Sequence, residues 1–185
     1  YGGIGQHLIS TSSWIFLMRI LAEFGSEVLD GYTIALRVLI FSILPSWGLS
    51  NAAATLVGQS LGAGKPTRAE KSVYRTAGVN MLLLGVIAVV FTLKPGFFIR
   101  LFIDDPSVIE HGAVALRIMS FGYLSYALGM VLPQAFNGAG DTKTPTLLNF
   151  ISFWLIEIPM AYFLAIVLGW HETGVYYAII CSETV

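Results

Sequence analysis

The sequence is poor in cysteine and in charged side chains. Cys181 is the single cysteine among 185 residues, which excludes an intramolecular disulfide and a cysteine-rich metal site. Asp, Glu, Lys and Arg make up 11% of the chain, compared with about 25% in a typical soluble domain. The formal net charge is −1, whereas nucleic-acid binding calls for an excess of clustered Lys and Arg. We therefore expect neither a nucleic-acid partner nor a bound cofactor.

Apolar side chains are correspondingly abundant. They make up 56% of the residues, more than the interior of a soluble fold of this size can bury. A helix needs about 20 apolar residues to cross the hydrocarbon layer, where backbone groups must pair within the segment. Six runs meet or approach this length: residues 4–22, 32–57, 77–93, 113–135, 147–168 and 174–185, the last one truncated. The sequence predicts an all-α membrane protein, with residues 1–185 forming one six-helix bundle in the lipid bilayer.

Two matching polar elbows separate some of these runs. Residues 58–70 and 136–145 each carry Gly-Ala-Gly directly after an apolar run, followed by a short charged stretch. Glycine permits sharp turns and close packing. The residues that we expect to form the elbows are Gly62, Gly64, Gly138, Gly140 and Asp141. Two membrane-length runs lie between the elbows, so both are expected on the same side of the bilayer.

The distribution of basic residues indicates which side that is. The first elbow and the start of the next run carry Lys65, Arg68, Lys71 and Arg75, whereas the preceding connection carries Glu23, Glu27 and Asp30. Lys and Arg accumulate on the cytoplasmic side of membrane proteins. We expect a multi-pass protein of the bacterial inner membrane with cytoplasmic elbows and both chain ends inside. The truncated sixth run also suggests a piece of a longer polypeptide.

The sequence contains fragments of catalytic and metal-binding motifs, but the spacing of their residues does not match those motifs. Gly62-Ala-Gly-Lys65 resembles part of a phosphate-binding loop, but it lacks a glycine five residues before Gly64, and Pro66 replaces the magnesium-binding Ser or Thr. The three histidines are far apart in sequence and form no ligand pair at helical spacing. The sequence shows neither a nucleophile elbow nor a pair of carboxylates at a shared site. We expect no enzymatic activity and no metal centre.

Polar and aromatic side chains recur at helical spacing inside the apolar runs. Three stripes result, with members at intervals of three or four residues: Gln6, Ser10 and Ser13; Tyr123, Tyr126, Met130, Gln134 and Asn137; Asn149, Phe153 and Glu157. Polar groups at membrane depth usually face a bundle interior or a cavity. The expected lining of a cavity for a small, partly apolar organic substrate, neutral or cationic, is Gln6, Ser10, Ser13, Tyr126, Met130, Gln134, Asn149 and Phe153. The alternative is that these groups only form hydrogen bonds between helices.

Glu157 is the carboxylate placed well inside a predicted span. It lies two residues before Pro159, which has no backbone donor and leaves a carbonyl unpaired. Glu157 is therefore a candidate for ion or proton coupling, and the alternative is a side chain that reaches the interface or pairs with an arginine. Pro45 and Pro133 interrupt two further spans. Helices broken in this way are frequent in transporters.

Two segments carry a resemblance to a known family. Ala52-Ala-Ala-Thr-Leu-Val-Gly-Gln-Ser-Leu-Gly-Ala-Gly64 and Gln134-Ala-Phe-Asn-Gly-Ala-Gly-Asp-Thr-Lys-Thr-Pro-Thr146, the latter followed by Trp154 and by Pro159-Met-Ala-Tyr162, resemble the multidrug and toxic compound extrusion (MATE) family. The resemblance implies one lobe of a twelve-helix, two-lobe antiporter that exports organic, often cationic compounds in exchange for Na⁺ or H⁺. It implies alternating access and, as a partner, an N-terminal lobe of the same polypeptide.

The stretch from Trp154 to Tyr162 is similar to the C-terminal lobe of bacterial members. Some members carry cation-binding carboxylates in the first and fourth helices of that lobe, where this sequence has Ser10 and Tyr126 or their neighbours. That departure leaves the coupling site open. Two other functions are also left open: a flippase for lipid-linked precursors from a related branch, and a receptor or scaffold that does not transport.

Overall fold

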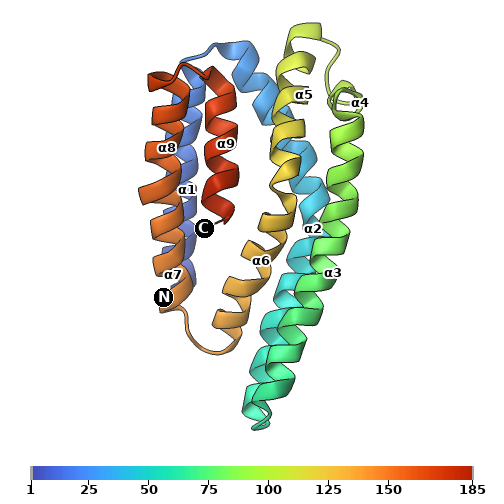
Figure 1. The fold of residues 1–185 in the computed structure, drawn as a ribbon, viewed down its shortest axis with the longest axis vertical. Coiled ribbons are helices and arrows are strands. Elements are labelled where there is room, and N and C mark those ends of the chain that lie inside the picture. The colour runs from blue at the N-terminus through green and yellow to red at the C-terminus, as the bar shows by residue number, and fades with distance from the viewer. Residues whose placement is uncertain (1, 185) are drawn as a thin grey trace.

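The computed structural model describes residues 2–184, and these residues fold into an all-helical bundle (Figure 1). The elements in chain order are α1 (Gly2–Ala22), α2 (Ser26–Gly62), α3 (Pro66–Leu93), α4 (Pro95–Arg100), α5 (Pro106–Phe121), α6 (Tyr123–Gly138), α7 (Lys143–Phe150), the π-helical segment η1 (Ile151–Glu157), α8 (Ile158–Tyr162), a second π-helical segment η2 (Phe163–Val167) and α9 (His171–Thr184). Each predicted apolar run coincides with one helix or with consecutive helices; the last residue of the sixth run, Val185, lies outside the described residues.

Within residues 2–184, three helical segments are long and apolar enough to cross a membrane: Ser26–Gly62, Pro66–Leu93 and Lys143–Val167. The pair α5 and α6 makes a fourth if it is counted as one bent span. α9 has only 14 residues within the described part of the chain. α1 has 21 residues and a polar stripe that includes Gln6 and Ser10, which lowers its apolar character.

The break between α5 and α6 lies at Gly122, where the two axes differ by 58°. A Cβ atom at position 122 would lie 3.0 Å from Cγ1 of Ile180 on α9, so the missing side chain lets α9 pack into the bend. The prediction that Pro133 and Pro45 interrupt their spans is wrong, because both lie inside continuous helices. Pro159 does lie at a junction, in the first turn of α8 and two residues after the end of η1.

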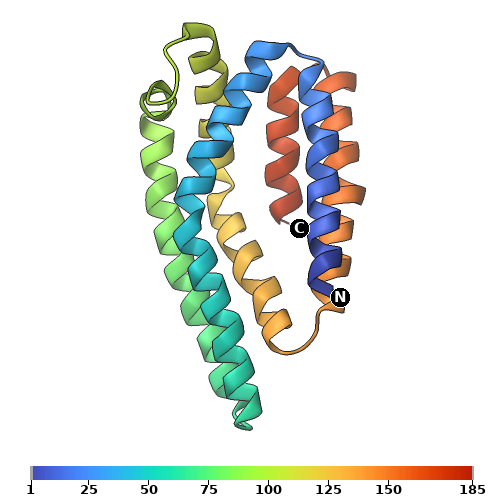
Figure 2. The ribbon, with the colours of Figure 1, turned by 180° about the vertical axis from the view of Figure 1, so that it is seen from behind.

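The helices form two groups with α9 between them (Figures 1 and 2). α2 packs against α3, α5 and α6, and α1 packs against the rod that runs from α7 to η2. α9 contacts α5 and α6 on one side and η1, α8 and η2 on the other. The largest fully buried side chains include Tyr32 of α2 and Tyr176 of α9, and they belong to one core cluster to which α1, α2, α3, α5, α6, α8 and α9 all contribute.

Both elbows end their helices with the same backbone motif, at the same end of the bundle (Figure 1). The amide of Lys65 donates to the carbonyl of Ser60, and the amide of Asp141 donates to the carbonyl of Phe136, at 2.9 and 3.0 Å. Gly64 and Gly140 adopt left-handed φ values of 69° and 87°, which glycine tolerates without strain. These are Schellman caps, so the repeated Gly-Ala-Gly sequence corresponds to a repeated structure.

Candidate functional site

A cavity of about 330 Å³ opens between α6, the α7–η1 segment and α9. Two side chains of the predicted third stripe, Asn149 and Phe153, line it. α9 contributes Ser182, Glu183 and Thr184 to the same lining. The cavity thus combines an amide, hydroxyls, an aromatic ring and one carboxylate, within walls that are mostly apolar.

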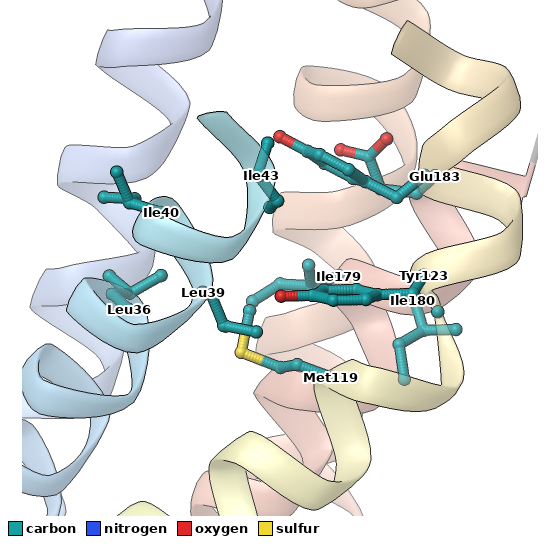
Figure 3. Close-up of a pocket in the computed structure, with 11 residues that line it drawn as sticks. Leu36, Leu39, Ile40, Ile43, Met119, Tyr123, Ile179, Ile180 and Glu183 are labelled. Carbon is teal, nitrogen blue, oxygen red and sulfur yellow. The ribbon is translucent and has the colours of Figure 1, made fainter. Parts of the chain in front are cut away.

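A second, smaller cavity of about 120 Å³ lies between α2, α5, α6 and α9. Its walls are apolar and aromatic, and Tyr126 of the predicted lining belongs to it together with Tyr123. Figure 3 shows Glu183 at one end of this space and Met119 at the other. Since Glu183 lines both cavities, it stands at the partition between them.

Glu183 is a residue that the sequence reasoning missed. It lies in the last, truncated apolar run, and a carboxylate in such a run is itself a signal of function. Gly129 of α6 faces it: a Cβ at position 129 would lie 3.3 Å from the Glu183 Oε2. The glycine therefore makes room for the carboxylate.

The structure does not bring the three predicted stripes together around one space. Gln6 donates from Nε2 to Oδ1 of Asn137 at 3.3 Å. The Ser10 hydroxyl donates to the carbonyl of Gln6 in its own helix. Gln134 accepts a hydrogen bond from Asn137 at 3.4 Å. These groups take part in the hydrogen bonds within and between helices that the alternative interpretation described.

Met130 belongs to a buried polar cluster instead. The hydroxyl of Ser46 donates to the Met130 sulfur at 3.3 Å and to Oδ1 of Asn80 at 2.6 Å. Asn80 is fully buried and donates in turn to the carbonyl of Ala127 at 3.0 Å. The cluster joins α2, α3 and α6. The sequence reasoning missed Asn80, although an amide in the middle of the apolar run 77–93 was the available signal.

Glu157 ends η1 and is 5% exposed. Pro159 lacks an amide hydrogen, and the helix before it widens into π-helical turns, so that the amide of Ile158 reaches back to the carbonyl of Phe153. The hydroxyl of Ser13, from α1, donates to that same carbonyl at 3.3 Å. Within the described residues, the ion pair is between His111 and Glu172, so Glu157 has no Lys or Arg partner there.

The elbow residues differ in how closely other atoms pack around them and in their hydrogen bonds. Gly62 has open space around it, whereas a Cβ at Gly138 would lie 2.2 Å from the carbonyl oxygen of Ala54. Asp141 caps α7, because its Oδ1 accepts from the amides of Lys143 and Thr144 at 3.0 and 3.1 Å. Hydrogen bonds from the hydroxyl and amide of Thr144 hold the pKa of the Asp141 carboxyl below its usual range. Asp141 thus stabilises the turn between α6 and α7.

No group of three or more His, Cys, Asp or Glu side chains within residues 2–184 is arranged to hold a metal ion. The polar and aromatic groups of the two cavities are the carboxylate of Glu183, the amide of Asn149, the hydroxyls of α9 and the aromatic rings, whereas Glu157 lines neither cavity. Such a lining can hold a cation or a proton and can contact an organic molecule through its apolar walls.

Comparison with known proteins gives consistent matches. The family model described as MatE matches residues 4–163. A protein described as a probable multidrug resistance protein NorM, from Thermotoga maritima, is 26% identical over 157 residues, which are 85% of this chain and 34% of that protein. The structure of the MATE transporter ClbM in complex with Rb⁺ superposes with a TM-score of 0.90 at 23% identity, over 96% of this chain and 41% of that one.

An outward-facing structure of a multidrug resistance MATE family transporter of the MOP superfamily superposes with a TM-score of 0.89 at 16% identity. The superposition covers 97% of this chain and 40% of the chain of that transporter. The chain thus spans between about a third and about two fifths of the length of these three proteins.

Proposed function

The chain belongs to the MatE family of membrane transporters, and we propose that it is one six-helix lobe of a twelve-helix antiporter that exports organic, often cationic compounds. The observation that carries this proposal is the cavity of about 330 Å³ between α6, η1 and α9, with Glu183 in its wall. A carboxylate beside an aromatic ring in an apolar cavity favours an organic cation, since charge and π-face both attract it.

We propose that the remaining half of the transporter is a second lobe of the same polypeptide. The chain covers 34% of the Thermotoga maritima relative and 41% of the ClbM chain, which is close to one lobe of two. The similarity of residues 154–162 to C-terminal lobes supports the assignment to that lobe. The second lobe would close the far side of the cavity.

Coupling requires a site whose occupancy changes the relative free energies of two conformations. Glu157 and Glu183 are the carboxylates available for this in the lobe, one buried at the end of η1 and one at the partition of the cavities. The structure of ClbM with Rb⁺ supports a monovalent cation as a ligand in this family. Na⁺ or H⁺ would serve as the coupling ion, and the elbow end, rich in Lys and Arg, would face the cytoplasm.

A flippase for lipid-linked precursors is the second candidate. A lipid diphosphate calls for cationic groups, whereas the lining of the larger cavity carries Glu183 and no Lys or Arg among its identified residues. A receptor or scaffold has no need for a cavity with a carboxylate in its wall at membrane depth. The lining therefore favours export over both alternatives.

The full-length polypeptide, expressed in a drug-susceptible bacterial host, tests the proposal. We expect it to raise resistance to lipophilic cations such as tetraphenylphosphonium, with an export rate that depends on either a Na⁺ or a pH gradient. Glu157→Gln should remove the gradient dependence, and the exposed Glu110 provides the matched control Glu110→Gln. Unchanged drug tolerance under both gradients would reject the export function.

A further inference from the structure

One face of α3 is exposed along most of the helix. Large exposed apolar side chains follow one another on it at intervals of three or four residues: Val79, Leu82, Val86, Val89 and Leu93. Such intervals return to the same side of an α-helix. The buried side chains of α3, such as Asn80 and Leu84, belong to the opposite side, which packs against the bundle.

The same spacing continues towards the elbow end of α3, where the side chains on this face become cationic. Three exposed cations precede the apolar residues: Arg68, Lys71 and Arg75. They are three and four residues apart, and Arg75 lies four residues before Val79. We call these three cations and the five apolar residues the outer face of α3.

The cations of the outer face lack a carboxylate partner within residues 2–184. The ion pair found there joins His111 of α5 to Glu172 of α9. Glu70 is near in sequence, but it lies two, one and five residues from the three cations, so it points to another side of the helix. The N-terminal end of α3 adds the positive end of a helix dipole at the same place. This end of the outer face therefore offers positive charge to an anion.

The length of α3 places these cations at the depth of lipid headgroups. Arg75 and Lys94 are 19 residues apart with no charged residue between them. That segment rises roughly 28 Å, and the hydrocarbon layer of a bilayer is about 30 Å thick. Tyr74, directly before Arg75, is exposed, as aromatic side chains at a membrane boundary commonly are. Arg68 lies roughly 10 Å beyond Arg75 along the helix axis, so the three cations extend through the headgroup layer.

The outer face lies away from the candidate substrate site. α3 stands at the margin of the bundle in both views (Figures 1 and 2). Neither of the two cavities has a residue of α3 among its identified lining. A row of Val and Leu without a polar group matches the acyl chains of a lipid, whereas a substrate cavity needs polar groups that orient its ligand.

We propose that the outer face of α3 binds an anionic phospholipid, with the headgroup at Arg68, Lys71 and Arg75 and an acyl chain along the apolar residues. Charge and apolar surface follow each other on one face in the order in which they occur in such a lipid. Arg holds a phosphate through two parallel N–H···O bonds, and Lys adds a point charge. The bound lipid fixes the depth of the α2–α3 hairpin, whose tip extends beyond the turn between α6 and α7 (Figure 1). The proposal does not depend on the export function.

Photo-crosslinking of lipids to the full-length polypeptide tests the site. The protein is reconstituted in phosphatidylcholine vesicles with increasing amounts of phosphatidylglycerol that carries a photoreactive acyl chain, and labelled peptides are identified by mass spectrometry. We expect saturable labelling of α3. Each Lys or Arg near an anionic lipid contributes about fivefold in affinity. Arg75→Gln should therefore weaken the labelling of α3 about fivefold, and the triple variant Arg68→Gln, Lys71→Gln, Arg75→Gln on the order of 100-fold.

The matched control is Lys143→Gln, which removes an exposed cation of the second elbow and should leave the affinity at α3 unchanged. The unfolding midpoint of the triple variant in pure phosphatidylcholine should equal that of the unsubstituted protein, which separates a lost headgroup contact from a damaged fold. Equal labelling of α3 by photoreactive phosphatidylcholine and phosphatidylglycerol would overturn the proposal. So would equal affinities of Arg75→Gln and Lys143→Gln, or displacement of the lipid by inorganic phosphate, which would identify a free anion as the occupant.

Discussion

Gly138 of α6 and Ala54 of α2 pack backbone against backbone, so closely that a Cβ at position 138 would lie 2.2 Å from the Ala54 carbonyl oxygen and 2.7 Å from its Cα. Neither of these atoms can move without moving α2 itself. The contact fixes the second elbow, residues 136–145, against α2. It explains why the first Gly of this elbow lies inside a helix, where its conformational freedom is not needed.

Gly138→Ala is therefore expected to destabilise the fold. Overpacking a tight contact typically costs about 1–3 kcal/mol, and here both opposing atoms are backbone. Thermal unfolding of the purified protein in detergent should show a lower midpoint. Gly62→Ala, at the corresponding position of the first elbow, has nothing within 4 Å of the new Cβ. A midpoint for Gly138→Ala as high as that of Gly62→Ala would contradict the packing.

Asp141 is expected to make the turn before α7 sensitive to acid. Hydrogen bonds from Thr144 lower the pKa of this carboxyl in the folded state below the ordinary value of 3.8. A lowered folded pKa means that the stabilisation is fully present above the ordinary value and is lost as the pH falls through the folded value. We measure the unfolding midpoint at a series of pH values between neutral pH and pH 3. In Asp141→Asn, the part of the decrease at low pH that comes from this carboxyl should be absent.

The control for that series is Asp104→Asn, which changes an exposed carboxylate near the opposite end of the bundle. Its unfolding midpoint should follow the unsubstituted protein at every pH. If the Asp141→Asn and Asp104→Asn profiles coincide, the cap contributes nothing to the pH dependence.

Asn80→Ala should destabilise the junction of α2, α3 and α6. It leaves the buried Ser46 hydroxyl and the Ala127 carbonyl without the bonds that Asn80 makes to them. Each unsatisfied buried group costs about 1–3 kcal/mol. Chemical unfolding in detergent measures the difference, with Asn51→Ala, an exposed amide on α2, as the control. Equal stability of the two variants would show that the cluster carries no net energy.

Gly129→Ala should impair the substrate site with little effect on folding. The new Cβ would lie 3.3 Å from the Glu183 Oε2, so the carboxylate must move by a few tenths of an ångström. Misplacing a binding group by such amounts lowers function, and we expect about a tenfold weaker interaction with tetraphenylphosphonium. Equilibrium binding to the full-length polypeptide is the measurement. Gly78→Ala, with open space around its Cβ, should bind normally.

The sequence predicts the elbows and the helices well because both depend on local chemistry. Gly64 and Gly140 adopt the left-handed conformation that a Gly after an apolar helix favours. The apolar runs coincide with helices because the length of an apolar run can be read directly from the order of residues in the sequence. Neither feature requires knowledge of which helices pack together.

The site is harder to predict because it depends on packing between distant segments. At the bend, Ile180 from 58 residues later packs into the space that a side chain at Gly122 would occupy. No local pattern distinguishes Gly122 from Pro133 as the position of a bend. The helical spacing assigns each stripe to one face of a helix, but it does not reveal which segment packs against that face. Gln6 meets Asn137, whereas Asn149 and Phe153 meet Glu183 across a cavity.

The 58° bend at Gly122 makes α6 a lever arm. α6 has 16 residues, so its axis extends about 24 Å from the bend at 1.5 Å per residue. A change of ten degrees at Gly122 would carry Gly138 sideways by about 4 Å, by the geometry of a rigid helix of that length. Because the second elbow is held against the backbone of α2 at Ala54, such a change at Gly122 would have to move α2 together with α6.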